Sequence, residues 1–244
     1  MPARDRSPTR HNLKDATMLG NVLIVGGSAS IAPEVVSAFG ANARGLTVTY
    51  RQPPPAPAAG IAVLACDLED SESIRAAAQC CCDLDVVVLL AGAITGVALA
   101  EASDAEIDRL TAVNLSGPAR LIRDLMPRLS KGARILLVSS IAGERGSFDS
   151  VYAATKGGMI ALAKSLATWR GSDFTTVVVA PGLIEQSAML NGMAPHRIEH
   201  HRSTTPAGEL LNRVDLARIL VDLAQPHWRH ANGAVIRVNG GAYV

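Results

Sequence analysis

Residues 21–32 read Asn-Val-Leu-Ile-Val-Gly-Gly-Ser-Ala-Ser-Ile-Ala, an apolar run that leads directly into a turn of small residues. A short run that is apolar at every position is typical of a strand buried on both faces of a sheet. The residues after the turn are predicted to form a helix that ends near Ala41. A strand, a tight turn and a helix in this order form the first unit of an α/β fold.

Six further apolar runs predict six more strands, separated by segments with helical patterns. One helix is expected to begin near Asp70 or Ser71, and a capping box of Ser103 and Glu106 opens another. This alternation predicts a doubly wound α/β fold, a seven-stranded parallel Rossmann-type sheet with helices on both faces. The later strands are predicted at residues 46–50, 61–66, 86–90, 134–139, 175–179 and 234–238.

The composition fits one domain with a large core. The chain has 244 residues, of which 48% are hydrophobic and 18% charged, and its formal net charge is +1. This balance indicates neither a nucleic-acid partner nor a membrane-surface partner. No apolar run is long enough to cross a bilayer, and the polar N-terminus lacks the apolar stretch of a secretory signal. We expect a mobile tail over residues 1–18 and the domain over residues 19–244.

Two local patterns complete this outline. The proline-rich residues 51–60 predict an extended loop between the second and third strands. The four cysteines, Cys66 and Cys80–Cys82, lack the paired spacing of a zinc site. Buried, reduced thiols in a cytoplasmic protein are the expectation, and no metal site is predicted.

The turn after the first strand is a candidate phosphate site. In doubly wound sheets, ligands bind beyond the carboxyl ends of the strands, and a helix N-terminus there favours anions. Gly26, Ser28, Ser30 and Ile31 are therefore candidate contacts for the pyrophosphate of a dinucleotide. The alternative is a tight turn with no ligand.

The second strand ends at Tyr50-Arg51, and the residue type there bears on the cofactor. An acid at this point would accept hydrogen bonds from the ribose 2′-hydroxyl of NAD, whereas an arginine suits the 2′-phosphate of NADP. Arg51 therefore favours NADP, with NAD as the other choice. A solvated loop arginine is the alternative interpretation.

Tyr152 and Lys156 are candidate acid–base residues. They stand at positions i and i+4 of a predicted helix and so share one face. An adjacent ammonium stabilises a phenolate and makes proton exchange with a carbonyl or alcohol oxygen feasible near neutrality. Ser139, at the end of the fifth strand, is expected to hydrogen-bond the same oxygen. An ordinary exposed helix contact is the alternative for the pair.

Asn114 lies four residues before Pro118, which has no N–H group. Its carbonyl is therefore expected to lose its helical partner, with a kink in the helix. That carbonyl could hold a water that relays protons from Lys156. A purely structural kink is the alternative.

Together these residues resemble the short-chain dehydrogenase/reductase family, most of all its 3-oxoacyl-carrier-protein reductase type. The resemblance runs from about Asn21 to the C-terminus and includes Pro181-Gly182 and residues 238–241, Val-Asn-Gly-Gly. It implies a catalytic tetrad of Asn114, Ser139, Tyr152 and Lys156, with Lys156 also holding the nicotinamide ribose. It further implies dinucleotide contacts from Asp67, Leu68, Ala91, Gly92, Tyr152, Pro181, Gly182 and Ile184.

The sequence departs from the family pattern in the phosphate turn and after the fourth strand. Val25, Ser30 and Ala32 stand where the family has Thr, Gly and Gly, and Leu89-Leu90 replace its two asparagines. The added Cβ atoms at Ser30 and Ala32 are expected to crowd the pyrophosphate and the helix–strand contact. Cofactor affinity is therefore the property that these replacements are expected to affect most.

The resemblance also implies a substrate lid over about residues 183–212. His196 and His200 have i, i+4 spacing in it, but no third metal ligand is evident, and Arg197, His201 and Arg202 make the segment basic. It is interpreted as a solvated basic lid, or as one that attracts an anionic or carrier-linked carbonyl or alcohol substrate.

The Tyr152 helix is apolar nearly all round, which indicates that a second subunit covers part of it. A homodimer or homotetramer is expected, and the resemblance implies a tetramer. The sequence therefore favours an NADP(H)-dependent oxidoreductase. Two alternatives remain, both catalytically silent: a dinucleotide sensor and a partner subunit.

Overall fold

The computed structural model describes residues 18–52 and 59–244 and contains one seven-stranded sheet in which every strand pair is parallel. The strand order is β3-β2-β1-β4-β5-β6-β7. Strands β2 and β3 are therefore added on one side of β1 and strands β4–β7 on the other, which places the topological switch point between β1 and β4. The predicted doubly wound Rossmann-type fold is confirmed. Its strands are β1 (Leu19–Val25), β2 (Ala43–Tyr50), β3 (Ile61–Ala65), β4 (Leu84–Leu89), β5 (Leu129–Val138), β6 (Phe174–Pro181) and β7 (Val235–Val238).

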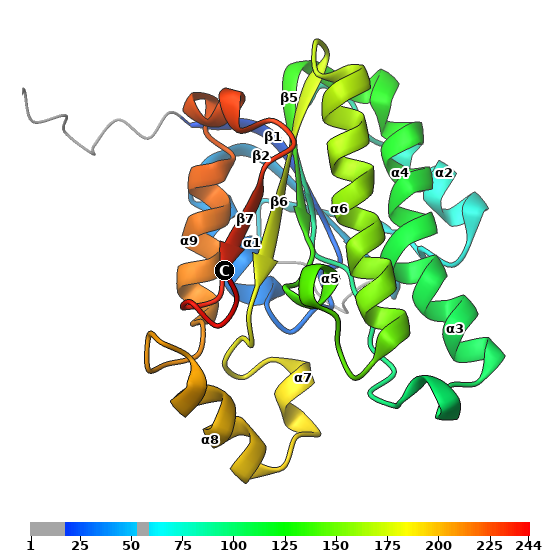
Figure 1. The fold of residues 1–244 in the computed structure, drawn as a ribbon. Helices are drawn as coiled ribbons and strands as arrows, with labels where there is room; N and C mark the ends of the chain where they lie inside the picture. Colours follow the sequence, from blue (N-terminus) through cyan, green and yellow to red (C-terminus); the bar gives the residue numbers. More distant parts are fainter. Residues whose placement is uncertain (1–17, 53–58) are drawn as a thin grey trace, which may run out of the picture.

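Helices cover both faces of the sheet. On one face lie α1 (Ala32–Gly40) and α9 (Arg213–Leu223), and on the other lie α2 (Ser71–Gln79), α4 (Gly117–Leu125) and α6 (Ser150–Arg170) (Figure 1). Each face buries its own apolar cluster, one centred on Phe39 and Leu220 and the other on Ile74 and Met159. The remaining α-helices of the described chain are α3 (Asp104–Thr111), α5 (Ala142–Arg145), α7 (Ala188–Asn191) and α8 (Pro195–Thr204).

The predicted helix starts are confirmed by their caps. The side chain of Asp70 accepts a hydrogen bond of 2.9 Å from the Glu72 amide at the start of α2. Ser103 and Glu106 form the reciprocal capping box that opens α3. Each cap satisfies amide groups that have no partner inside the helix.

The fifth strand differs from its prediction at both ends. It begins at Leu129 rather than Arg134, because Leu129 pairs with Leu84 across an irregularity in the β4–β5 register. Its first residues are polar or half-exposed, so they lack the apolar signal on which the prediction rested. The strand ends at Val138, one residue before Ser139.

A π-helical turn, Ala112–Ser116, interrupts the chain between α3 and α4, where Pro118 predicted a kink. The amide of Gly117 bonds to the carbonyl of Ala112, five residues back. This wider turn lies where Pro118 cannot donate the regular bond. The free carbonyl of Asn114 stays a prediction.

Two sequence predictions fall largely outside the described residues. These are the mobile tail over residues 1–18, of which 1–17 are not described, and the proline-rich loop, of which 53–58 are not described. Within the described chain, no helix combines the length and the apolar character needed to span a bilayer.

Candidate active site

Asn114 is fully buried and joins two segments beside the carboxyl end of β4. Its Oδ1 accepts a hydrogen bond of 2.7 Å from the Ala93 amide, and its Nδ2 donates to the Ala93 carbonyl at 2.9 Å. Nδ2 also donates to Thr155 Oγ1 on α6 at 3.1 Å. The side chain therefore fixes the loop after β4 against the helix that carries Tyr152.

Asp149 holds the start of that helix. One carboxylate oxygen accepts the Tyr152 amide at 2.9 Å, and the other accepts the Thr95 amide, the Thr95 hydroxyl and the Gly96 amide at 2.8, 2.8 and 3.0 Å. Burial acts to raise the pKa of this carboxyl, but its four hydrogen bonds together lower it. The sequence reasoning missed Asp149, although an aspartate just before a helix is an ordinary capping signal.

Lys156 is buried one turn after Tyr152 on α6. Its Nζ donates a hydrogen bond of 2.9 Å to the Val138 carbonyl and lies 5.8 Å from the centroid of the Tyr152 ring. Burial lowers the pKa of the ammonium to about 8. A Cβ added at Gly92 would lie 3.2 Å from this Nζ and 3.7 Å from Asn114 Oδ1, so Gly92 meets both side chains closely.

The two serines after β5 have different environments. Ser139 is buried, and its hydroxyl donates 2.8 Å to the Lys156 carbonyl. Ser140 is less buried, its Oγ accepts a hydrogen bond of 3.1 Å from the Ala142 amide, and its side chain acts to lower the pKa of Tyr152. Successive residues in extended chain point in opposite directions, so only one of the two can face Tyr152. The structure brings Ser140, rather than the predicted Ser139, to the phenol.

The phenol of Tyr152 is 8% exposed and stands in a mixed environment. Burial raises its pKa, hydrogen bonding with Ser140 acts to lower it, and the Asp149 carboxylate acts to raise it. The net direction is upward, so the phenol carries its proton at neutral pH. Such a group is prepared to donate a proton rather than to accept one.

A cavity of about 260 Å³ lies beyond the end of β1. None of Asn114, Ser140, Tyr152 and Lys156 lines it, but its wall includes Gly92, which closely approaches Lys156 and Asn114. Its wall includes seven of the predicted dinucleotide contacts, namely Gly26, Ser28, Arg51, Asp67, Leu68, Ala91 and Gly92. Gly26 has a φ of +103°, and a Cβ there would lie 2.6 Å from the Ala91 amide. Glycine therefore lets the first turn pack directly against the chain after β4.

Ser30 and Ile31 do not line this cavity. Ser30 Oγ accepts a hydrogen bond of 3.1 Å from the Ala188 amide of α7, and its carbonyl accepts 2.9 Å from Arg213 Nη1. Arg213 also reaches Gln186 at 2.8 Å, and Gln186 has a φ of +54°. Ile31 is buried at the start of α1. The phosphate turn is therefore linked directly to the segment after β6.

Pro181, Gly182 and Ile184 lie where the chain leaves β6. Pro181 is the last residue of the strand, and the Gly182 amide donates 2.9 Å to the Val238 carbonyl. Ile184 forms an isolated parallel bridge with Leu211, which closes the base of the predicted lid. These residues do not line the 260 Å³ cavity.

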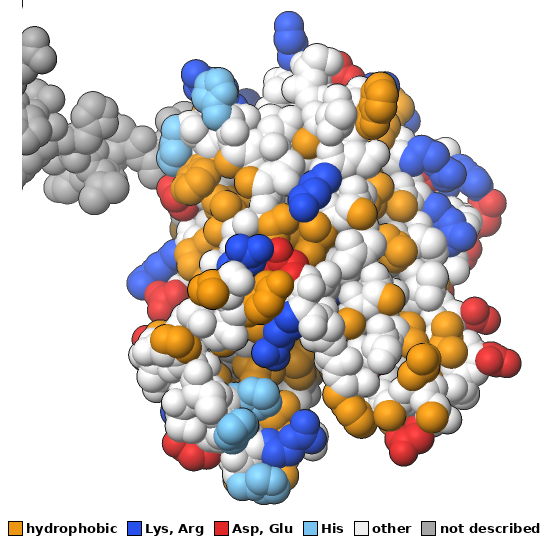
Figure 2. Space-filling model, in the orientation of Figure 1, with side chains coloured by type: hydrophobic (Ala, Val, Ile, Leu, Met, Phe, Trp, Pro, Cys, Tyr) orange, Lys and Arg blue, Asp and Glu red, His pale blue; other side chains and the backbone are white. Residues whose placement is uncertain are grey.

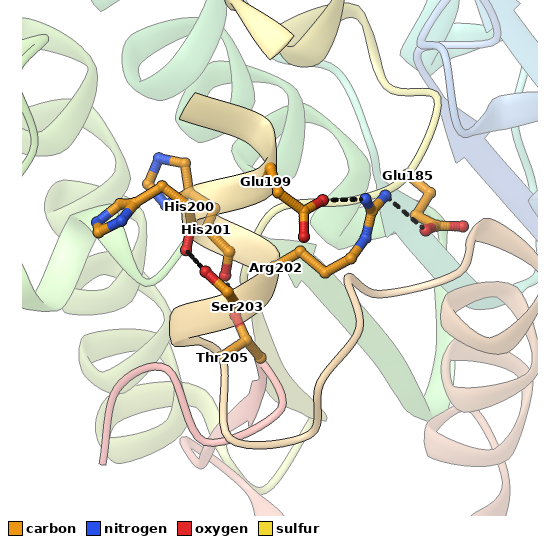
Figure 3. Close-up of polar contacts among 7 residues, drawn as sticks. All are labelled: Glu185, Glu199, His200, His201, Arg202, Ser203 and Thr205. Carbon is orange, nitrogen blue, oxygen red and sulfur yellow. Dashed lines mark hydrogen bonds and ion pairs between the residues drawn. The ribbon is translucent and has the colours of Figure 1, made fainter. Parts of the chain in front are cut away.

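The predicted lid carries α7 and α8 and projects from the main body (Figure 1). Histidine side chains gather on α8 at the molecular surface (Figure 2). Figure 3 shows Arg202 between two carboxylates, with Glu199 at 2.8 Å and Glu185 at 3.7 Å. Among the described residues, no group of three His, Cys, Asp or Glu side chains could hold a metal ion.

A second, smaller cavity of about 160 Å³ lies under α8. His201 lines it, and burial lowers the pKa of His201, with His200, Arg145 and Arg197 acting in the same direction. Arg145 and Glu209 give this cavity charges of both signs.

The short helix α5, directly after Ser140, is held from the opposite edge of the sheet. Arg237 of β7 donates two hydrogen bonds of 2.8 Å to the carboxylate of Glu144. The same guanidinium lies 5.5 Å from the Tyr243 ring centroid, and Asn239 Nδ2 donates 2.7 Å to the Tyr243 carbonyl. The C-terminal residues therefore contact the group that positions α5.

A Rossmann-type sheet with a glycine turn after β1 and a tyrosine–lysine pair on α6 defines a dinucleotide-dependent oxidoreductase class. Comparison with known proteins identifies the family. The model of the Enoyl-(Acyl carrier protein) reductase family matches residues 26–243. The chain belongs to the short-chain dehydrogenase/reductase family, whose members are NAD(P)-dependent oxidoreductases of alcohols and carbonyls.

Curated relatives are similar along most of their length. The 3-oxoacyl-[acyl-carrier-protein] reductase FabG of Vibrio harveyi is 29% identical over 239 residues, which is 95% of this chain and 88% of the relative. The protein of the same name from Salmonella typhimurium is 31% identical over 217 residues, or 87% and 83% of the two chains.

Solved structures share the fold. A 3-oxoacyl-[acyl-carrier protein] reductase from Brucella melitensis has a TM-score of 0.80 and 26% identity, and covers 100% of this chain and 98% of its own. BdcA in complex with NADPH has a TM-score of 0.80 and 25% identity, with 92% and 95% covered.

Proposed function

We propose that this chain is an NADP(H)-dependent oxidoreductase that transfers a hydride between nicotinamide and a carbonyl or secondary alcohol, with Tyr152 as the general acid and base. One observation carries the proposal. Tyr152 and Lys156 of α6, Ser140 after β5 and Asn114 of the π-helical turn converge from three segments, next to Gly92, which lines the 260 Å³ cavity. Convergence of a proton donor, its hydrogen-bond partner and a buried ammonium is what carbonyl reduction requires.

In the reductive direction, Tyr152 donates its proton to the carbonyl oxygen as negative charge develops there. The Ser140 hydroxyl donates a hydrogen bond to the same carbonyl oxygen and holds that oxygen within reach of the phenol. The ammonium of Lys156 stabilises the phenolate that remains, which lowers the energy of the proton transfer. Asn114 and Asp149 act as positioning residues, since they hold the loop after β4 and the start of α6 in one arrangement.

The wall of the cavity fits a dinucleotide because Gly26 and Gly92 leave room where a Cβ would meet backbone or Lys156. Gly26, Ser28, Asp67, Leu68, Ala91 and Gly92 would hold it, with Arg51 beside the adenosine ribose. When bound, the nicotinamide supplies or accepts the hydride. The exposed guanidinium of Arg51 supports NADP over NAD, and the NADPH complex of BdcA is in line with this choice.

The substrate is proposed to be an anionic or carrier-linked carbonyl compound. The FabG relatives are named for reduction of a carrier-linked 3-oxoacyl group. Arg197 of α8 supports the same class, since its guanidinium would attract an anionic group toward the lid, whereas Arg202 is paired with Glu199 and Glu185.

We also propose a homodimer or homotetramer and a cytoplasmic location. Trp169 near the end of α6 is 80% exposed, and Leu162 and Leu166 of the same helix are only partly buried. A second subunit would cover these apolar groups. The expectation of buried thiols holds for Cys66 and Cys81 but is wrong for Cys80 and Cys82, which are exposed. All four cysteines are free, which supports a reducing compartment.

The test is an NADPH-oxidation assay over aldehydes, ketones and acyl thioesters. Wild-type protein is expected to reduce at least one class, and Tyr152→Phe is expected to lose at least about a thousandfold in kcat/KM while it still binds NADPH. NADPH binding without turnover of any carbonyl would instead indicate the catalytically silent protein. A Tyr152→Phe variant of undiminished activity would disprove the role of the phenol.

A further inference from the structure

Three charged side chains meet at one end of the dinucleotide cavity. Arg51 follows β2, Glu69 follows β3, and Arg109 comes from α3, and all three line the cavity wall. Arg51 Nη1 and Arg109 Nε lie 3.7 and 3.6 Å from the same oxygen, Glu69 Oε1. Side chains distant in the sequence therefore converge on one carboxylate.

The place of this cluster in the sheet decides which part of a ligand it would meet. The strands β2 and β3 form one edge of the sheet, whereas Tyr152 lies beside β5. Arg109 stands one helical turn before Val113, and both line the cavity. The cluster therefore lies at the end of the cavity far from the reacting group, where the adenosine half of a dinucleotide would bind.

The geometry of the cluster leaves its donors available. Both ion-pair distances exceed those of a direct charge-assisted hydrogen bond. The side chains of Arg51 and Arg109 are 57% and 49% exposed, so both remain accessible to a ligand. Each guanidinium carries several donors, and one long contact to Glu69 leaves most of them free.

The backbone of Glu69 is held in place by its own turn. Asp67 Oδ1 accepts a hydrogen bond of 3.0 Å from the Glu69 amide, and the Asp67 amide donates 2.9 Å to Ser73 Oγ. This turn fixes the backbone from which Glu69 extends into the cluster. The backbone that presents the Glu69 carboxylate to the two arginines is therefore fixed, and the side chain itself is 34% exposed.

We propose that Arg51 and Arg109 together bind the 2′-phosphate of the adenosine ribose and that Glu69 opposes this binding, so that the three residues set the preference between NADP and NAD. The inference rests on the proposed function, because it concerns the same dinucleotide site. A phosphate would meet two cations from different elements, and charge-assisted bonds to both would favour NADP. Glu69 would repel the same phosphate and neutralise part of the positive charge, which reduces that preference.

The proposal is tested by fluorescence titration of the full chain with NADPH and NADH, which differ only in the 2′-phosphate. Arg109→Gln is expected to weaken NADPH binding on the order of tenfold and to change NADH binding less than about twofold. Glu69→Gln is expected to tighten NADPH binding severalfold and to leave NADH nearly unchanged.

The chain offers a matched control pair. Glu72 and Arg75 form an i, i+3 ion pair on α2, immediately after the same turn, and neither lines the cavity. Glu72→Gln and Arg75→Gln change the net charge equally and are expected to leave the ratio of the two dissociation constants within about twofold. Thermal melts of all four variants separate a binding effect from a loss of stability.

The proposal fails if Arg109→Gln changes the two dissociation constants by the same factor, or no more than Arg75→Gln does. It also fails if Glu69→Gln weakens NADPH binding. If Arg109→Gln selectively loses NADPH affinity but the wild-type chain reduces no carbonyl, the role of the charge cluster is supported and the proposed enzymatic function is wrong. If the wild-type chain reduces a carbonyl but Arg109→Gln leaves the ratio of the two dissociation constants unchanged, the proposed function is supported and the role of the cluster is wrong. A wild-type chain that binds neither dinucleotide would contradict both proposals.

Discussion

The hydroxyl of Ser139 donates a 2.8 Å hydrogen bond to the backbone carbonyl of Lys156 and so ties the end of β5 to the middle of α6. That hydroxyl is buried and is committed to the helix backbone. The neighbouring Ser140 is left to meet Tyr152. The two serines therefore have separable roles, one in stability and one in chemistry.

Alanine substitutions should separate them. Ser140→Ala is expected to lower kcat/KM by about 10²–10³ with little change in the unfolding free energy, because it removes a hydrogen bond to the reacting oxygen. Ser139→Ala is expected to destabilise the chain by about 1–2 kcal/mol, since it removes a buried donor, and to keep most of the activity. Steady-state kinetics and denaturant unfolding measure both. The reverse pattern would return the catalytic role to Ser139.

Lys156 should reduce the stability of the fold while it serves the site. Burial lowers its pKa from 10.5 to about 8, so the unfolded chain holds this proton across that range while the folded chain releases it. The unfolding free energy should therefore rise with pH between these values. Lys156→Met is expected to stabilise the chain at pH 7 by up to about 3 kcal/mol and to abolish activity.

Lys164→Met is the control for this substitution, because Lys164 lies on the same helix with an exposed side chain. The stability gain of Lys156→Met should shrink toward zero near pH 10.5, whereas Lys164→Met should change little at any pH. Urea unfolding at several pH values provides the comparison. A pH-independent gain would mean that the buried charge is not its source.

Asp149 should be sensitive to the loss of a single charge. In Asp149→Asn, an amide nitrogen would face donors of Thr95 and Gly96, so a cost of about 3 kcal/mol in unfolding free energy is expected. Asp70→Asn is the matched control, because Asp70 caps α2 through one acceptor contact and asparagine caps a helix equally well.

The pH dependence of this effect has a definite sign. The pKa of Asp149 is lowered in the fold, so its contribution is complete above the unfolded value of about 4 and is lost as the pH falls through the folded value. The difference in unfolding free energy between wild type and Asp149→Asn should therefore become smaller as the pH falls. A difference that stays constant to low pH would contradict this account.

The hydrogen bond that links the turn after β1 to the lid can be tested by amide hydrogen exchange. Ser30→Gly removes the acceptor of the Ala188 amide, and that amide is expected to exchange about tenfold faster. Ser28→Gly is the control, because Ser28 lies in the same turn and the hydrogen bond to Ala188 comes from Ser30. Equal protection of Ala188 in both variants would show that the hydrogen bond does not hold the lid.

Local patterns were sufficient for the fold, since each buried strand is an apolar run and two helices carry visible caps. They also located Tyr152 and Lys156, which share one helix face. The choice between Ser139 and Ser140 could not be made, because it depends on where β5 ends and which way the next residue turns.

The contacts of Ser30 and the charged cluster around Glu69 could not be predicted from the sequence either. Ser30 meets a residue 158 positions away, and nothing in its neighbours in the sequence indicates the pairing. Glu69 and Arg109 belong to separate elements whose approach is set by how α3 packs against the turn after β3. Such pairings follow from tertiary packing alone.

The contact of Tyr243 with Arg237 has a practical consequence for handling the protein. Arg237 holds Glu144 of α5, and α5 begins two residues after Ser140, so the last residues of the chain are mechanically connected to the reacting end of the site. Removal of Tyr243 by a carboxypeptidase would break this contact. Partial degradation from this end should therefore show itself as lost specific activity before it shows as lost folding.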